Sequence, residues 1–468
     1  MFMPDAAAWA QRTFGQCQFG DSRRTRRLVF LASMQASSAA ACTRQVCDGD
    51  SAAAEGAYRL LRNDHIQPDA IAEGAFQSVA EEASTRPLLV AAEDTTTLTV
   101  SKALKMELGD VGGPAAAAVQ GLFVHSVLLV DPQSKETIGL IEQQRWARDP
   151  ATRGKRHDRR TRAYEDKESF KWQSASERMA TRLGETMSRV ISACDREADI
   201  YEYLLYKQAR GERFVVRCSW DRGLADSDVR LREQVASWRV IGSSEVEVAQ
   251  RGGKHGRSAR KARVVLRAGK LSLRAPLRLD KKGAPIPLSV VDVREEDAPD
   301  GVEPLHWTLL SSEAVSNPAE AAQILDYYRL RWRIEEFHKA WKTGCGAEMR
   351  RPHSADNYER LVVVLAFVAV RILQLRELER AHADASCERV LTRLEWRCLW
   401  ASTQKTPSPK EPPSALWAVN AIAKLGGWIP NNRTQRPGWI VLWRGWERFE
   451  ERLEAVEIVR RLMAEGEM

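Results

Sequence analysis

Short apolar runs recur along the middle of the chain, starting at about residue 86. They occupy residues 88–92, 121–130, 137–141, 190–194 and 214–218. Apolar runs of this length predict buried strands. A helical pattern over residues 198–208 separates the last two runs. The middle of the chain is therefore predicted to build a mixed α/β core.

The order of these elements narrows the fold. Three closely spaced strands followed by helix, strand, helix and strand is the order of a ribonuclease-H-like mixed sheet. A charged, β-rich stretch at about 219–306 interrupts the pattern and is predicted to be an insertion into this core. Helical patterns precede and follow it. We therefore expect an RNase-H-like core domain over 71–403, with helical domains at 1–70 and 415–468.

The most regular helical pattern begins at Asn317 and ends at Gly344. Asn317 can cap a helix, Pro318 suits its first position, and Glu320 stands where a capping-box acid belongs. One long helix is predicted. At about 100° per residue it carries an apolar stripe, which contains Tyr327, Leu330, Ile334, Phe337 and Trp341. A second stripe borders the first and contains Tyr328, Arg331, Glu335, Lys339 and Lys342.

The same geometry separates two adjacent glutamates. Glu335 lies within the polar stripe, whereas Glu336 is rotated by about 100° and is expected to point further towards solvent. Glu335 is therefore the candidate for chemistry. The alternative is an ordinary ion pair with Arg331 or Lys339, which stabilises a helix by only about 0.2–0.5 kcal/mol.

Two further acids stand where predicted strands give way to turns. Asp94 follows the first apolar run and Asp195 follows the fourth. A carboxylate at the end of a strand lies at the rim of the sheet, where catalytic groups of α/β folds gather. Each acid alone fits a helix cap or a turn former better than a catalytic group. Together with Glu335, and joined by the predicted strand order, they indicate one site for divalent ions.

Phosphodiester chemistry explains why three carboxylates would converge. It must activate a water molecule or a 3′-hydroxyl and stabilise the leaving oxygen, and two Mg²⁺ ions about 3.5–4 Å apart can serve both ends of an in-line displacement. Oxygen ligands suit Mg²⁺, with Mn²⁺ as a substitute. We therefore expect Asp94, Asp195 and Glu335 to bind two Mg²⁺ ions.

The charge balance favours a polyanionic partner. The chain carries 71 Lys and Arg against 63 Asp and Glu, a net charge of +8, and the excess is concentrated in clusters. Arg23, Arg24, Arg26 and Arg27 form the first, and Arg59 and Arg62 lie three residues apart on one predicted helix face. Two more basic blocks cover residues 145–171 and 251–270. Solvated helix faces and charged loops are the alternatives.

Cysteine usage and hydropathy indicate a cytoplasmic location. The eight cysteines are scattered and contain no CxxC pair, which disfavours a zinc site and a disulfide framework. The longest apolar run, residues 361–370, is too short to cross a bilayer. It is expected to be a buried helix.

A Pro-rich stretch at 404–414 is predicted to link the core to a C-terminal unit. The last predicted helix of that unit carries an apolar stripe. The stripe contains Trp446, Phe449, Leu453, Val456, Val459 and Leu462. Such a stripe packs on its own domain or on a second copy of the chain.

The segment YRLRWRIEEFHKAWKTGCGAE resembles the Y-(2)-R-(3)-E-(6)-K signature of bacterial DDE cut-and-paste transposases of the insertion-sequence-four class, the Tn-five group in particular. EDTTTL and CDREADIY resemble the contexts of the two catalytic aspartates of that family. GDSRRTRRL, EGAYRLLRN, VHSVLL, DKESFKW, ERFVVRC, FVAVRILQLRE and AIAKLGGW extend the resemblance over essentially the whole chain. The 145–163 region is longer and more basic than the corresponding loop of the family.

The resemblance implies roles for individual residues. Asp94, Asp195 and Glu335 would be the catalytic metal ligands, and Trp307 would stack on a flipped base during hairpin formation. Tyr328, Arg331, Lys342 and Arg217 match residues that handle DNA phosphates near the cleavage point, and Lys339 shares their stripe. Arg24, Arg27, Arg59 and Arg62 fall in the segment that resembles the end-recognition domain.

The function expected from the sequence is therefore DNA transposition. The enzyme would bind double-stranded DNA at the terminal inverted repeats, nick one strand, form and open a hairpin, and join both ends to target DNA. The resemblance implies a homodimeric synaptic complex, with the C-terminal stripe as the candidate dimer contact. The rivals are an RNase-H-like nuclease or resolvase that does not join ends, and a DNA-binding relic without catalysis. A two-carboxylate glycosidase is less favoured, because the surrounding Arg, Lys and Tyr suit phosphate.

Overall fold

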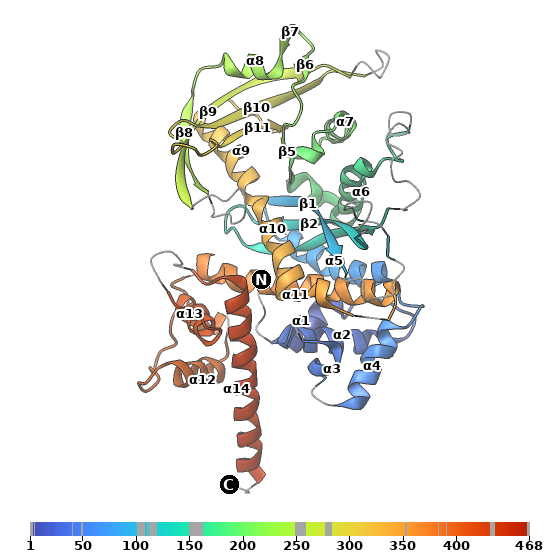
Figure 1. Ribbon diagram of the computed structural model, residues 1–468, viewed down its shortest axis with the longest axis vertical. Coiled ribbons are helices and arrows are strands. Elements are labelled where there is room, and N and C mark those ends of the chain that lie inside the picture. Colours follow the sequence, from blue (N-terminus) through green and yellow to red (C-terminus); the bar gives the residue numbers. More distant parts are fainter. Residues whose placement is uncertain are drawn as a thin grey trace.

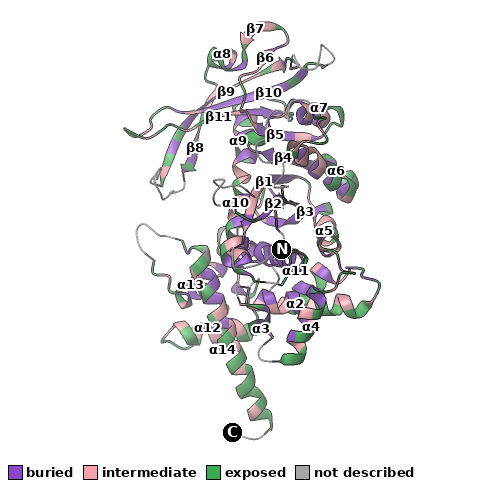
Figure 2. Ribbon diagram, turned by 45° about the vertical axis from the view of Figure 1, so that its right-hand side comes forward, coloured by how far each residue is buried: buried purple, intermediate pink, exposed green. Residues whose placement is uncertain are grey.

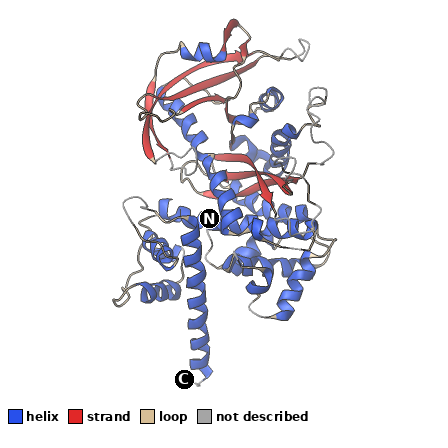
Figure 3. Cartoon of the chain, in the orientation of Figure 1, coloured by secondary structure: helices blue, strands red, loops and turns tan. Residues whose placement is uncertain are grey.

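The structure is a computed structural model. It describes residues 3, 5–39, 41–47, 50–100, 108–109, 111, 119–148, 162–248, 259–276, 283–351, 353–381, 383–389, 391–430 and 436–465. Strands occupy the centre and one end of the molecule, and helices occupy the other end, where the last helix projects (Figures 1 and 3). Most of the basic 145–163 loop and residues 251–258 of the later basic block lie outside the described residues.

The N-terminal part is helical, as predicted. It contains α1 (Ala6–Phe14), α2 (Ser22–Ser37), α3 (Thr43–Val46), α4 (Ser51–Leu61) and α5 (Pro68–Ser84). Asp5, Asp21 and Asp50 accept backbone N–H bonds at the starts of α1, α2 and α4, as helix caps do.

The core sheet has the predicted strand order. Its strands are β1 (Leu89–Thr99), β2 (Gly121–Val130), β3 (Thr137–Trp146), β4 (Val190–Cys194) and β5 (Arg213–Arg217). They lie in the order β3-β2-β1-β4-β5. The first three are antiparallel, and β4 is parallel to both β1 and β5. Helices α6 (Lys171–Leu183) and α7 (Tyr201–Ala209) complete this RNase-H-like α/β core.

The β-rich insertion extends this sheet. It contains β6 (Gly223–Leu224), β7 (Ser227–Arg230), α8 (Leu231–Ala236), β8 (Gly242–Val248), β9 (Arg260–Leu273) and β10 (Ile286–Glu295). The next strand, β11 (His306–Ser311), returns to pair with β5. Across the described residues the sheet therefore has 11 strands that run continuously from β3 into the insertion.

The segment predicted as one long helix is divided, which corrects that prediction. It forms α9 (Pro318–Leu330), α10 (Trp332–Lys339) and a π-helical turn, η7 (Ala340–Gly344). At Arg331 the hydrogen bonding changes to the 3-10 type, because the Arg331 N–H donates to the Tyr328 carbonyl, three residues back, at 3.1 Å. In η7 the Cys345 N–H reaches the Ala340 carbonyl, five residues back. Asn317 caps α9 as predicted.

The C-terminal helices are α11 (Ala355–Ala381), α12 (Arg393–Thr403), α13 (Ala415–Leu425) and α14 (Trp439–Glu465). Short 3-10 turns are η3 (Glu168–Phe170), η4 (Gly184–Arg189), η5 (Arg196–Ala198), η8 (Ala347–Met349) and η9 (Cys387–Arg389). The apolar run 361–370 lies in α11 and is buried throughout, as expected (Figure 2). None of the described helices combines the length and apolar character that a membrane-crossing helix requires.

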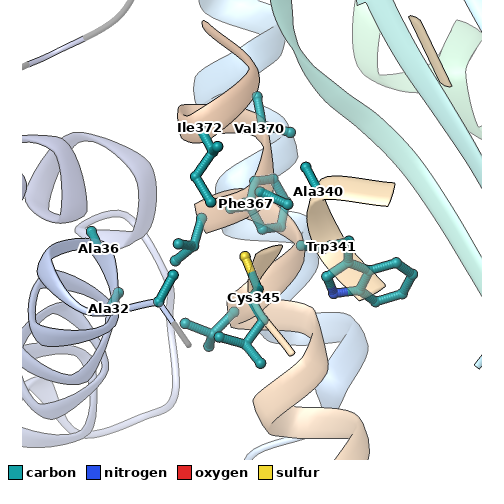
Figure 4. Packing of buried hydrophobic residues seen from close by; sticks show 14 of the residues in the cluster. Ala32, Ala36, Ala340, Trp341, Cys345, Phe367, Val370 and Ile372 are labelled. Carbon is teal, nitrogen blue, oxygen red and sulfur yellow. The ribbon is translucent and has the colours of Figure 1, made fainter. Parts of the chain in front are cut away.

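One hydrophobic cluster joins the two ends of the chain. Ala32 and Ala36 of α2 face α11, which contributes Phe367 and Ile372 (Figure 4). The same cluster includes residues of α13 and the first half of α14, among them Phe449. The N- and C-terminal helices therefore share one core.

Arginines of α11 also donate hydrogen bonds to backbone carbonyls at and after the ends of the N-terminal helices. The buried Arg360 guanidinium donates to the Ile66 carbonyl at 2.6 Å and the Leu61 carbonyl at 2.9 Å. Arg371 donates to the Ala36 carbonyl at the end of α2 at 2.9 Å. These donors satisfy carbonyl groups at and beyond helix ends that would otherwise be buried without partners.

The Pro-rich stretch at 404–414 lies against neighbouring helices. The Pro413 carbonyl accepts from the Cys387 N–H at 2.8 Å, and the Thr406 carbonyl accepts from the indole of Trp400 at 3.0 Å. The stretch is therefore packed at both ends.

Candidate active site

Asp94 lies within β1 and not at its end, which corrects the sequence-based placement. The parallel pairing with β4 ends at Ala92 and Ala193, but β1 continues to pair with β2 through Thr99. Asp94 thus lies two residues beyond the parallel part of the sheet. Its Oδ1 accepts from the Thr95 N–H at 2.8 Å.

Asp195 directly follows β4, as predicted. Its Oδ1 accepts from the Glu197 N–H at 2.8 Å and caps η5. The cap therefore exists, but it uses one carboxylate oxygen and keeps the side chain at the end of the strand next to β1.

Arg331 connects the other two acids. Its guanidinium donates to Asp94 Oδ2 at 3.3 Å and to Glu335 Oε1 at 2.7 Å. The ion pair between Glu335 and Arg331 considered from the sequence is present, and the same arginine also reaches β1. Asp94 and Glu335 are therefore brought to one place by the cation between them.

The charge of Asp195 acts on Asp94. Burial raises the pKa of Asp94 to about 6, the positive charge of Arg331 opposes this, and the negative charges of Asp195 and Glu335 add to the rise. The three carboxylates thus repel one another in a partly desolvated site.

The side chains suit a hard divalent cation by their chemistry, since all the candidate ligands are carboxylate oxygens. In the parts of the chain that the structure describes, no three His, Cys, Asp or Glu side chains are grouped closely enough to hold a metal ion. Arg331 holds one oxygen each of Asp94 and Glu335 in this arrangement. A metal ion and this guanidinium would compete for the same oxygens.

Aromatic and basic side chains line one side of the carboxylates. The Trp307 ring on β11 lies edge-on to Tyr328 with 5.6 Å between centroids, and Arg331 lies 5.9 Å from the Tyr328 ring centroid. Burial raises the pKa of Tyr328, and the positive charges of Arg331 and Arg217 oppose that rise. Arg217, at the end of β5, donates to the His306 carbonyl at 3.3 Å. Trp307 is half-buried and is therefore not fully enclosed in the hydrophobic core.

The two lysines of the polar stripe differ. Lys342 Nζ lies 3.4 Å from Thr96 Oγ1 on β1 and 3.4 Å from Glu348. Lys339 is exposed. The structure therefore brings Lys342 to the strand that carries Asp94.

Glu336 does not face solvent, contrary to the expectation from helical geometry. Its side chain is 12% exposed, whereas that of Glu335 is 34% exposed. Glu336 accepts from Arg333 at 2.8 Å and from Arg376 of α11 at 2.9 Å. The helix face assigned to water is covered by α11, which lies later in the chain.

A buried polar pair lies beside Asp94 and escaped the sequence analysis. Glu93 and His125 are completely buried, and His125 Nε2 lies 3.7 Å from Glu93 Oε2. Among the described residues, neither Glu93 oxygen has a partner within hydrogen-bond distance. The detectable signal was a histidine inside the apolar run of β2.

The candidate DNA-binding arginines of the N-terminal part lie on two helices that pack together, Arg24 and Arg27 on α2 and Arg59 and Arg62 at the end of α4. Arg24 donates to the Phe19 carbonyl at 2.7 Å, and Arg27 is exposed. Arg59 pairs with Glu55 at 3.0 Å, and Arg62 lies over the Tyr58 ring. They belong to different elements from those that carry the carboxylates.

Comparison with known proteins agrees with this division. Residues 6–66 match the family described as Transposase DNA-binding, and residues 124–371 match the family described as Transposase DDE domain. The second match spans more than half of the chain and includes Asp195 and Glu335, while Asp94 precedes it. One solved structure, the cryo-EM structure of a piggyBac transposase synaptic complex with hairpin DNA, is 10% identical with a TM-score of 0.38. The alignment covers 81% of this chain and 76% of that one.

Proposed function

The chain belongs to the DDE transposase family, and from this we propose that it performs cut-and-paste transposition in the manner of the insertion-sequence-four class and its Tn-five group. It is a DNA transposase with a DNA-binding segment and a DDE domain. The proposed steps are a nick that frees a 3′-hydroxyl, hairpin formation, hairpin opening by water, and joining of the ends to target DNA. Two observations support this proposal. Asp94 and Glu335 both accept from Arg331, and the negative charge of Asp195 raises the pKa of Asp94.

Asp94, Asp195 and Glu335 would hold the metal ions. Two Mg²⁺ ions, or Mn²⁺ in their place, would supply activation of the attacking oxygen and stabilisation of the leaving one. The carboxylates supply only oxygen ligands, and their mutual repulsion is relieved by a nearby cation. Arg331 would release them when the ions bind and become available for a DNA phosphate.

The residues around the carboxylates would hold the DNA. Arg217, Arg331 and Lys342 are cationic donors suited to phosphate oxygens. The half-buried Trp307 ring, supported by Tyr328, would stack on an unpaired base during hairpin formation. Lys339 is exposed beside them and would contact the backbone.

The N-terminal arginines would read the transposon end. Arg27, Arg59 and Arg62 are exposed in the segment that matches a DNA-binding family, and Arg24 supports the start of α2. Double-stranded ends and target DNA are the proposed partners, in a synaptic complex of two copies of the chain. The second half of α14, which exposes Ile458, Val459 and Met463, is the proposed dimer contact.

The decisive experiment compares the wild type with Glu335→Gln. Purified protein, Mg²⁺ and a DNA fragment with the terminal repeats that flank its own gene should yield hairpins and joined products with the wild type only. Glu335→Gln should bind the ends with unchanged affinity and melt at the same temperature, because Glu335 is on the surface of the site.

Other outcomes favour the rivals. Cleavage without joined products would indicate a nuclease or resolvase. End binding without any cleavage by the wild type would indicate a DNA-binding relic.

A further inference from the structure

The loop that follows β5 presents an indole ring to solvent. Trp220 is 65% exposed, and it is more exposed than Trp332 at 47%. An indole in water leaves apolar area unburied, and exposed aromatic rings are frequent anchors of binding sites. A single exposed apolar residue is otherwise ordinary, so its setting must decide its role.

A buried aspartate accepts hydrogen bonds from the backbone of this loop. Asp199, after η5, accepts from the Ser219 N–H at 2.7 Å and from the Trp220 N–H at 2.9 Å. Arg222 pairs with the other Asp199 oxygen. The Trp220 carbonyl accepts from the Cys218 thiol. Because the loop is already ordered, binding through Trp220 would cost little backbone entropy.

The loop starts at the edge of the sheet that carries the carboxylates. Cys194 pairs with Val216, so Asp195 and Arg217 are the next residues on two adjacent parallel strands. The Cys218 N–H donates to the Thr308 carbonyl, next to Trp307. Trp220 lies three residues after Arg217, which limits their Cα separation to about 10 Å. The backbone of Trp220 therefore lies close to Arg217, the arginine proposed to bind a phosphate, at the end of β5 (labelled in Figure 1).

The segments next to the indole carry exposed side chains of both signs. Arg196 and Arg232 are exposed cations, whereas Arg230 is paired with Asp221, and Asp226, Asp228 and Glu233 are exposed acids. Asp221 is occupied by the Arg230 ion pair and the Arg232 N–H, and Glu197 is paired with Lys171. An exposed aromatic ring can hold an unpaired nucleobase by stacking, and the nearby Arg217, Arg196 and Arg232 can hold the adjacent phosphates by charge.

We propose that Trp220 is a second base-stacking residue, distinct from Trp307, which holds an unpaired nucleobase of the DNA strand next to the phosphate at Arg217. The base can come from the transposon end with its flank or from the target. This inference rests on the proposed transposase function for the identity of the DNA, while the stacking itself can be measured without catalysis.

The test places 2-aminopurine at successive positions in single-stranded extensions of an end duplex and, separately, of a target duplex. The wild type should quench the fluorescence at a position of one duplex where Trp307→Ala still quenches. Trp220→Ala should lose this quenching and bind that DNA about ten-fold more weakly, and Trp220→Phe should restore most of both. The duplex that responds identifies the source of the base.

Ile429→Ala removes another exposed apolar side chain, 77% exposed, and should change nothing. Equal melting temperatures will show that Trp220→Ala folds normally. Unchanged quenching and affinity in Trp220→Ala would overturn the inference, as would a change in sedimentation alone, which would mean that the indole contacts a second chain. Wild-type cleavage with no effect of Trp220→Ala would refute only this inference, whereas Trp220-dependent stacking without Glu335-dependent cleavage would refute only the transposase steps.

Discussion

Arg331 and Asp94 form a 3.3 Å ion pair across 237 residues of sequence. The same guanidinium donates to Glu335 one helical turn away. One side chain of the α9–α10 junction therefore connects the strand and the helix that carry two of the three candidate metal ligands. It neutralises carboxylates that would otherwise repel each other.

Replacing Arg331 by alanine should tighten Mn²⁺ binding by several-fold and at the same time reduce DNA cleavage strongly. The guanidinium competes with a cation for oxygens of Asp94 and Glu335, and it is also a proposed phosphate ligand. Titration calorimetry with Mn²⁺ measures the first effect. Arg329→Ala, at an exposed ion pair with Asp326, is the control. Weaker Mn²⁺ binding by Arg331→Ala would contradict the competition.

Replacement by glutamine should have opposite effects at Glu335 and Glu336: it should mainly affect cleavage at the first and stability at the second. Glu336→Gln weakens the ion pairs with Arg333 and Arg376 and should destabilise the fold by about 1–3 kcal/mol. Glu335→Gln should leave stability nearly unchanged and abolish cleavage. Thermal melts and cleavage assays on both variants separate the two roles, and an equally destabilised Glu335→Gln would argue against them.

Glu377 should make stability depend on pH. Its carboxyl group is buried on α11 and accepts from the N–H and hydroxyl of Thr137 at 2.6 and 2.8 Å. Burial raises its pKa from 4.5 to about 7. The folded chain therefore keeps this proton up to about pH 7, whereas the unfolded chain loses it near 4.5.

The contribution of Glu377 should thus be fully present below pH 4.5 and fall as the pH rises to 7, by up to about 1.4 kcal/mol per pH unit. Glu377→Gln should flatten the dependence of melting temperature on pH between 5 and 8. Glu454→Gln, on the exposed part of α14, is the control. If Glu377→Gln keeps the wild-type slope, the buried carboxyl group is not its source.

Glycines let α13 and α14 approach closely. A Cβ atom on Gly445 would overlap the Ile422 carbonyl of α13, and one on Gly426 would overlap the Val441 carbonyl of α14. Gly445→Ala should therefore separate the helices and destabilise the fold by about 1–3 kcal/mol. Gly56→Ala in α4 meets nothing and should be neutral or stabilising. Differential scanning calorimetry distinguishes them, and equal melting temperatures would refute the close contact.

The projecting half of α14 should control pairing of the ends. Val459→Glu places a charge in its exposed apolar surface and should reduce paired-end complexes by at least about ten-fold, while binding of a single end stays unchanged. Arg461→Gln on the same helix also changes the net charge by −1 and is the matched control. Gel-shift assays with one or two labelled ends read both quantities. A point substitution is sharper than removal of 415–468, which would also strip Phe449 from the shared core.

Local patterns were enough to predict the core strands and the position of Asp195. The strand order follows from apolar runs, and Asp195 follows β4 directly because a short buried strand ends where the apolar run ends. The polar stripe predicted on the single helix likewise placed Arg331 and Glu335 together beside the buried face, and the structure pairs them.

Contacts from distant segments explain the errors. Helical geometry placed Glu336 in water, but Arg376 of α11 covers it. The apolar run ends near Asp94, but β2 extends the pairing of β1 to Thr99. The interruption lies at Arg331, whose side chain binds Asp94 of β1, a contact that no local pattern contains.

The arginines of α11 that donate to the N-terminal helices have a consequence for synthesis of the chain on the ribosome. Carbonyl groups of Leu61, Ile66 and Ala36 accept hydrogen bonds from the buried Arg360 and Arg371, which are translated about three hundred residues later. The helices of residues 6–66, which match a DNA-binding family, can therefore complete their packing only after the segment with Glu335 has emerged. In a nascent chain, this packing and the full set of carboxylates would become available at nearly the same time.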